Sequence, residues 1–254
     1  MEIPKKIFAT GTHFYKYSSL EFPERLKGIL LDHELYLPSP PELNDPADGR
    51  PQLAPLTEEK MFDFLHNANR NPTLTPAAQQ KLLGTLAHSI RSLGPETLMR
   101  KMDRLLNDLF KSHGIYSLSK RYDNMLLWGT YAAGHKGYCL EFANEGNLFK
   151  YPLEVIYGDA FPMDVTNPEH RKAYFFYCKR KIWSHEEEVR LLFLDGGGRK
   201  FKFDPHCLTR IILGWKMPED HEKMIREWAK QREPELVVVK AYFDELDYKL
   251  KLRG

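Results

Sequence analysis

The sequence is poor in the features that mark several common protein classes. It has three cysteines in 254 residues, Cys139, Cys178 and Cys207, and no two of them have metal-knuckle spacing. A disulfide framework and a structural zinc site are therefore not expected. No run approaches the ~20 apolar residues of a membrane-spanning helix, and the first residues lack the apolar segment of a secretory signal. We expect a cytoplasmic protein with reduced thiols and no membrane partner.

The chain also lacks a large excess of charge of one sign. Its 37 basic and 35 acidic residues give a formal net charge of +2, so nothing demands a nucleic-acid or membrane surface. Short basic clusters at residues 179–181 and 199–202 are typical of solvated surface. A glycine-rich phosphate loop, a His-Glu-x-x-His helix motif and a nucleophile elbow are all missing. The hydrophobic fraction of 42% is that of a folded globular protein.

Hydrophobic periodicity predicts a single α+β domain over residues 1–254, with a mixed, partly antiparallel sheet and flanking helices. A helical insertion at residues 57–113 separates the two sheet-forming halves. Further helices are predicted at residues 21–31, 124–133, 168–180 and 219–231. The predicted strands are residues 12–17, 34–38, 114–119, 137–142, 153–157, 187–193, 200–203, 211–214, 237–242 and 248–252. A triple-glycine turn at residues 196–198 is expected to join the strands at 187–193 and 200–203 as a hairpin.

Residues 183–193 place charge on a segment with the pattern of a half-buried strand. Apolar residues alternate at positions 189, 191 and 193, so Glu186, Glu188 and Arg190 fall on the opposite face. One interpretation is a solvated or ion-paired strand face. The other is a catalytic pair of glutamates at a strand end, with Arg190 holding one carboxylate in place.

Two more segments contain candidate binding residues near the start of the chain. Lys16 lies between Tyr15 and Tyr17 on the first predicted strand, so the cation and the tyrosines project from opposite faces. Asn44 and Asp45 follow the second strand and can present side-chain acceptors to a ligand, or form a simple Asx-turn.

The third candidate segment runs from a helix through a glycine-rich turn into a strand. Trp128 and Tyr131 lie three residues apart and share a helix face. That face is either core or the wall of a cleft that stacks a flat ring. His135 lies in the turn and is a further candidate for ligand binding.

Four ordered motifs resemble those of a bacterial domain-of-unknown-function family. They are a Tyr-Lys-Tyr start, a Ser-Pro-x-x-Phe-Asn-Asp-Pro-x-Asp loop, a Trp-x-x-Tyr-Ala-x-x-His-x-Gly turn and a Trp-Ser-x-Glu-x-Glu-x-Arg strand. Here they occupy residues 14–17, 39–48, 128–142 and 183–190, with Leu43 replacing the usual Phe. They lie on both sides of the predicted insertion, and the family description assigns no chemistry.

The opening of the chain also resembles, more distantly, ADP-ribosyltransferase-like folds. The resemblance implies that Lys16 occupies the first-strand position that holds NAD, where those enzymes have His or Arg. Ser117 or Ser119 would lie beside the nicotinamide on a middle strand, and Glu186 or Glu188 would stabilise the ribosyl cation on a late strand. Lysine cannot make the planar bidentate contact of a guanidinium.

The leading hypothesis is therefore an ADP-ribosyltransferase-like protein, a toxin or phage-defence effector, that uses NAD on an unknown protein or nucleic-acid acceptor. One alternative is a non-enzymatic sensor of a nucleotide or phosphate ligand. The other is a metal-dependent hydrolytic effector with Asp45, Glu186 and Glu188 around the ion, although no metal-ligand spacing is present. The first hypothesis requires Lys16, Ser119 and Glu188 to converge on one pocket.

Overall fold

The computed structural model describes residues 7–50, 52–55, 111–146, 149, 151–164 and 174–254, and scattered positions between 57 and 110. Most of the predicted helical insertion at residues 57–113 therefore lies outside the described residues, as does the first part of the predicted helix at residues 168–180.

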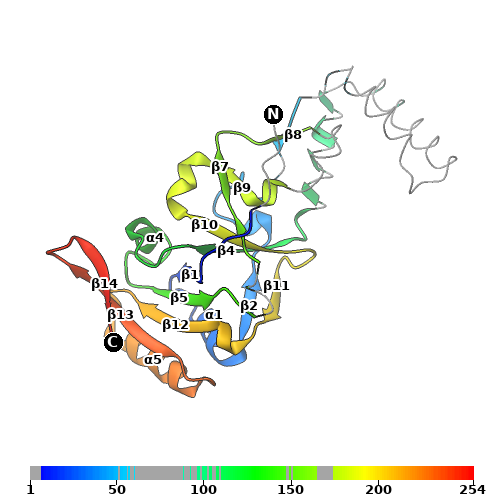
Figure 1. Ribbon diagram of the computed structural model, residues 1–254. Coiled ribbons are helices and arrows are strands. Elements are labelled where there is room, and N and C mark those ends of the chain that lie inside the picture. Colours follow the sequence, from blue (N-terminus) through cyan, green and yellow to red (C-terminus); the bar gives the residue numbers. More distant parts are fainter. Residues whose placement is uncertain are drawn as a thin grey trace.

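An eight-stranded sheet forms the centre of the protein, in the order β14-β13-β12-β5-β1-β4-β10-β6 (Figure 1). All its neighbours are antiparallel except β12 and β13, which are parallel. This mixed sheet with few helices confirms the predicted α+β class. Its strands are β1 (His13–Ser18), β4 (Gly114–Ser119), β5 (Tyr138–Ala143), β6 (Leu153–Glu154), β10 (Glu188–Phe193), β12 (Leu208–Leu213), β13 (Val237–Asp244) and β14 (Lys249–Arg253).

Helices cover both faces of this sheet. On one face lie α1 (Pro23–Lys27), the π-helix η1 (Gly28–Asp32) that continues it, and α5 (Glu219–Gln231), which supply core residues such as Leu26, Leu30 and Ile225. On the other face lies α4 (Met125–Thr130), which buries Leu127 and Trp128. Because β5 is covered on both faces, all six of its residues are buried.

Short turns of 3₁₀ helix complete the fold. They are η2 (Pro40–Glu42), η4 (Tyr174–Tyr177), η5 (Lys181–Glu186) and η6 (Pro205–Cys207). None of the helices in the described part of the chain is long and apolar enough to cross a membrane.

Three two-stranded ribbons flank the main sheet, and the first corrects the predicted hairpin. They pair β2 (Glu34–Leu37) with β11 (Arg199–Lys202), β3 (Gln52–Leu53) with β8 (Pro162–Met163), and β7 (Ile156–Gly158) with β9 (Cys178–Arg180). The glycine turn does not fold β11 back onto β10. Instead Gly197 N–H donates to Ser112 O and Gly198 N–H to Leu37 O, so the turn directs β11 to β2.

The predicted helix at residues 168–180 is wrong over its second half. Residues 174–177 form η4, which buries Phe175 and Phe176 in a core cluster with Ile115 and Leu153. The chain then becomes β9, which pairs in parallel with β7. Because this pairing is non-local, a helical pattern read along the chain does not reveal it.

Candidate functional site

A cavity of about 500 Å³ lies where β1 and β4 separate. The two strands pair at one position, Tyr15 opposite Ser119. Residues 15–19, which run from β1 to just past its end, all line the cavity. Residues 116–119 of β4 line it as well. Side chains of a strand alternate between faces, so consecutive lining residues mean that the main chain of both segments forms the wall. The cavity therefore opens between two strands of the sheet.

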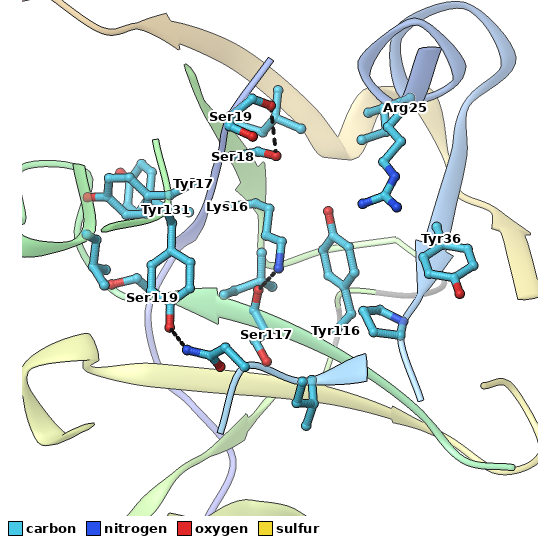
Figure 2. Close-up of a pocket in the computed structure, with 18 of the residues that line it drawn as sticks. Lys16, Tyr17, Ser18, Ser19, Arg25, Tyr36, Tyr116, Ser117, Ser119 and Tyr131 are labelled. Carbon is cyan, nitrogen blue, oxygen red and sulfur yellow. Dashed lines mark hydrogen bonds between the residues drawn. The ribbon is translucent and has the colours of Figure 1, made fainter. Parts of the chain in front are cut away.

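Lys16 bridges this gap. Its ammonium donates to the Ser117 carbonyl at 3.0 Å and lies 4.9 Å from the centroid of the Tyr116 ring. Figure 2 shows the side chain reaching across from β1 to β4. Burial lowers the pKa of Lys16, and the charges of Glu188 and Glu186 oppose that effect. The Lys16 ammonium thus makes a hydrogen bond between β1 and β4 in the region where the two strands do not pair.

A buried ion pair lies next to this gap, on the face of β10 that carries Glu188 and Arg190. The Arg190 guanidinium donates to both oxygens of Glu188, at 2.7 and 3.0 Å. It also donates to both oxygens of Asp48, at 2.8 and 2.6 Å. Burial alone would raise the pKa of Glu188, but the charges of Arg190 and Lys179 outweigh it and lower that pKa to about 2. The face is ion-paired and buried rather than solvated.

Lys179 joins the same cluster, which corrects the prediction that residues 179–181 are solvated surface. Its ammonium contacts Glu186 at 2.5 Å, Glu188 at 3.1 Å and Asp48 at 3.4 Å. The side chain is only 4% exposed. Burial lowers the pKa of Lys179, but the nearby carboxylates reverse that shift and raise it. The lysine is therefore an internal counterion.

Glu186 does not lie on the strand, contrary to the alternation prediction. It ends η5, and Glu187 then adopts a left-handed conformation with φ of 45° before β10 starts at Glu188. One oxygen of Glu186 accepts from the Tyr131 hydroxyl at 2.6 Å and the other from Lys179. The left-handed turn sets the Glu186 carboxylate in the cavity wall beside Glu188.

Hydrogen bonds connect three of the four sequence motifs. Asn44 donates to the Tyr131 hydroxyl at 2.8 Å, which links the 39–48 loop to α4. Trp183 Nε1 donates to Asp45 at 2.7 Å and thereby holds the same loop to η5. Lys16 places the first motif in the wall of the same cavity. The four motifs therefore meet at one site.

Two residues predicted to bind a ligand lie outside the cavity wall. Trp128 is fully buried in the core under α4, where its Nε1 donates to the Tyr122 carbonyl. His135 stacks on Trp128 with ring centroids 6.0 Å apart, and neither residue lines the cavity. Tyr131, one helical turn later, does line it. The shared helix face is therefore divided between core and cavity.

The other candidates divide in a similar way. Those in the cavity wall are Tyr15, Lys16, Tyr17, Asn44, Ser117, Ser119, Tyr131, Glu186 and Glu188. Arg190 lies behind Glu188 with no exposed surface, and Asp45 holds Trp183 and the Ala47 amide. Ser119 is committed to the Glu186 carbonyl at 2.8 Å, which anchors the end of η5. Lys16, Ser119 and Glu188 therefore converge on one pocket.

Sequence reasoning missed several wall residues. Asp48 is the last residue of the 39–48 motif, and that position was the one available signal for it. Arg25 from α1 points into the cavity near Tyr116 and Tyr36 (Figure 2), and has no ion-pair partner among the residues that the structure describes. No local pattern distinguishes Arg25 from the other charged residues of α1.

The carboxylates do not form the arrangement proposed for a metal site. Asp45 lies outside the cavity wall, and the oxygens of Glu186 and Glu188 already accept hydrogen bonds from Lys179 and Arg190. Across the described residues, no group of three or more His, Cys, Asp or Glu side chains is placed to hold a metal ion. Lys179 and Arg190 supply the positive charge that faces these carboxylates.

No protein-family model, curated protein or solved structure matches the chain. The resemblances drawn from its four motifs and from its first strand and helix therefore stay predictions. Any function assigned to the protein rests on the geometry of the cavity and on the chemistry of its residues.

Proposed function

We propose that the protein is an ADP-ribosyltransferase-like enzyme that cleaves NAD at the bond between nicotinamide and ribose. The observation that supports this most directly is the convergence of Lys16, Ser119 and the two glutamates on one cavity. A volume of about 500 Å³ lies within the ~300–1,000 Å³ range of small-molecule sites.

Glu186 is the better candidate for the reactive carboxylate. Both oxygens of Glu188 are bound by Arg190, and its pKa of about 2 makes it a weak base at neutral pH. Glu186 ends a helical turn in the cavity wall, and its partners are one hydroxyl and one ammonium. Glu188 then serves to hold Arg190 and Lys179 in place.

The reaction can be written with these groups. The C1′–N bond of the nicotinamide ribose breaks, and its electron pair neutralises the positive ring nitrogen of the leaving nicotinamide. The Glu186 carboxylate stabilises the ribosyl cation that develops. An acceptor lone pair then forms the new bond to C1′, and the acceptor proton passes to solvent. With water as acceptor the products are nicotinamide, ADP-ribose and a proton.

The charges of the wall favour a cationic ring at this position. The lining residues include four with cationic side chains, Lys16, Arg25, Lys179 and Lys200, against six with carboxylates, Glu24, Glu34, Glu42, Asp48, Glu186 and Glu188. Arg190, behind the wall, pairs with two of these carboxylates, so the surplus is one negative charge, which favours the nicotinamide ring and a ribosyl cation. Arg25, without an ion-pair partner among the described residues, is available to the diphosphate.

The test compares Glu186→Gln with Glu187→Gln. Both changes remove one negative charge, but the Glu187 side chain is half-exposed and does not line the cavity. Purified protein is incubated with NAD, and nicotinamide release is measured by chromatography. We expect E186Q to lower the rate by roughly 100-fold or more and E187Q to leave it within about twofold. Absence of nicotinamide release from wild type, in the presence of protein and nucleic-acid acceptors, would refute the proposed cleavage of NAD.

A sensor is the second candidate, because one observation favours it. The carboxylates of Asp48, Glu186 and Glu188 are already paired with Lys179 or Arg190. A wall neutralised in this way can shape a nucleotide site without performing chemistry. Calorimetry decides between the two: NAD or ADP that binds without turnover, with an affinity that E186Q leaves unchanged, favours the sensor.

A further inference from the structure

A chain of hydrogen bonds runs along the cavity wall from the 39–48 loop to Glu186. Asn44 Nδ2 donates to the Tyr131 hydroxyl at 2.8 Å, and this hydroxyl donates to Glu186 Oε1 at 2.6 Å. The three residues come from the loop after η2, the C-terminal end of α4 and the end of η5. All three line the cavity, and Figure 2 shows the bond that reaches Tyr131 from the loop.

The direction of this chain follows from the groups themselves. An ionised carboxylate only accepts, so Tyr131 must give its single proton to Glu186. The lone pairs of the hydroxyl oxygen then remain, and an amide N–H of Asn44 fills one of them. A residue with only an acceptor at position 44 would instead compete with Glu186 for the same proton. The Asn44 amide therefore fixes where the proton of Tyr131 points.

We propose that Asn44 is a positioning residue that commits the Tyr131 proton to Glu186. This rests on the proposed function, in which Glu186 stabilises the ribosyl cation. Tyr131 donates to one oxygen of Glu186 at 2.6 Å and thereby orients the carboxylate in the cavity wall. Asn44 acts through Tyr131, so its contribution is to turnover rather than to ligand affinity.

Two variants of Asn44 separate this role from a ligand contact. Asn44→Ala removes the donor, and we expect kcat for nicotinamide release to fall roughly 10-fold while KM for NAD changes less than about twofold. Asn44→Asp supplies an acceptor and a negative charge, which draws the Tyr131 proton away and disfavours ionised Glu186. The acid limb of the kcat–pH profile should move to higher pH, by about one unit for ~1.4 kcal/mol.

Gln52→Glu is the matched control for the second variant. It makes the same change from amide to carboxylate at an exposed position on β3 that does not line the cavity. Its pH profile should superimpose on that of wild type. A rise in KM with unchanged kcat in Asn44→Ala would make Asn44 a ligand contact, and an unmoved acid limb in Asn44→Asp would overturn the proposal.

The hydrogen-bond chain has a test that needs no turnover. A double-mutant cycle of Asn44→Ala and Tyr131→Phe in urea unfolding should show a coupling of roughly 5-fold in the unfolding equilibrium constant. Additive effects would overturn the proposal even in an active enzyme. If wild type releases no nicotinamide, the role in turnover fails together with the proposed function, and coupling in the cycle shows that the hydrogen bond itself is formed.

Discussion

Glu188→Gln perturbs the buried ion cluster at its centre. The carboxylate is about 3% exposed and accepts from Arg190 through both oxygens and from Lys179 at 3.1 Å. Its pKa falls from 4.5 to about 2 in the folded protein. At ~1.4 kcal/mol per pH unit, this difference contributes about 3 kcal/mol to the free energy of unfolding at neutral pH. Gln at position 188 removes that contribution and leaves Lys179 and Arg190 short of one counter-charge.

The pH dependence of this loss has a defined sign. A carboxyl group whose pKa is lower in the folded state stabilises the fold above its unfolded pKa, near 4.5. That stabilisation disappears as the pH falls toward 2, because wild type then protonates Glu188. The difference in unfolding free energy between wild type and E188Q should therefore shrink between about pH 5 and pH 3.

Urea unfolding followed by circular dichroism measures this difference at a series of pH values. Glu187→Gln is the control, since its side chain is 43% exposed and its one ion pair, with Arg121, is long at 3.6 Å. The control should stay within about 0.5 kcal/mol of wild type. A loss below about 1 kcal/mol in E188Q at pH 7, or a loss that is the same at pH 7 and pH 3, would refute the role assigned to the cluster.

Three further predictions concern packing, ligand contact and thiols. Trp128→Ala should lower the free energy of unfolding by about 3–5 kcal/mol, because Trp128 fills the core and not the cavity; a normal melting curve in that variant would contradict this. Lys16→Met should weaken NAD binding at least tenfold in calorimetry, about 1.5–3 kcal/mol for a charged hydrogen bond; unchanged affinity would remove Lys16 from the site. Burial raises the pKa of Cys178 to about 12 and that of Cys207 to about 11. Ellman's reagent at pH 8 should therefore label these thiols only after unfolding, and rapid labelling of the native protein would contradict this prediction.

Elements with a strong local pattern were predictable from sequence. The predicted strand at residues 114–119 and the predicted helix at residues 219–231 have the bounds of β4 and α5. In α5 the buried residues Ile225 and Ala229 lie four apart, and acidic residues occupy the first turn. Both signals lie within one segment. The pairing of β11 with β2 depends instead on where the glycine turn packs against residues from other segments.

The sequence predicted which residues belong to the candidate site better than it predicted how they are arranged. The alternation of apolar residues placed Glu186 and Glu188 on one strand. It could not reveal the left-handed turn at Glu187, because glutamate seldom adopts a positive φ. The burial of Lys179 was missed for a related reason. A lysine becomes internal only when carboxylates surround it, and those of Asp48, Glu186 and Glu188 gather around it only in the folded chain.

The contact between Asp48 and Arg190 also bears on synthesis. It joins residues 142 positions apart in the sequence, and such non-local contacts form after local ones because the long intervening loop must first close. Translation supplies Asp48 well before Arg190. A nascent chain that has not reached Arg190 therefore has no complete ion cluster beside its cavity. Chains that terminate before Arg190 should be inert toward NAD at any concentration.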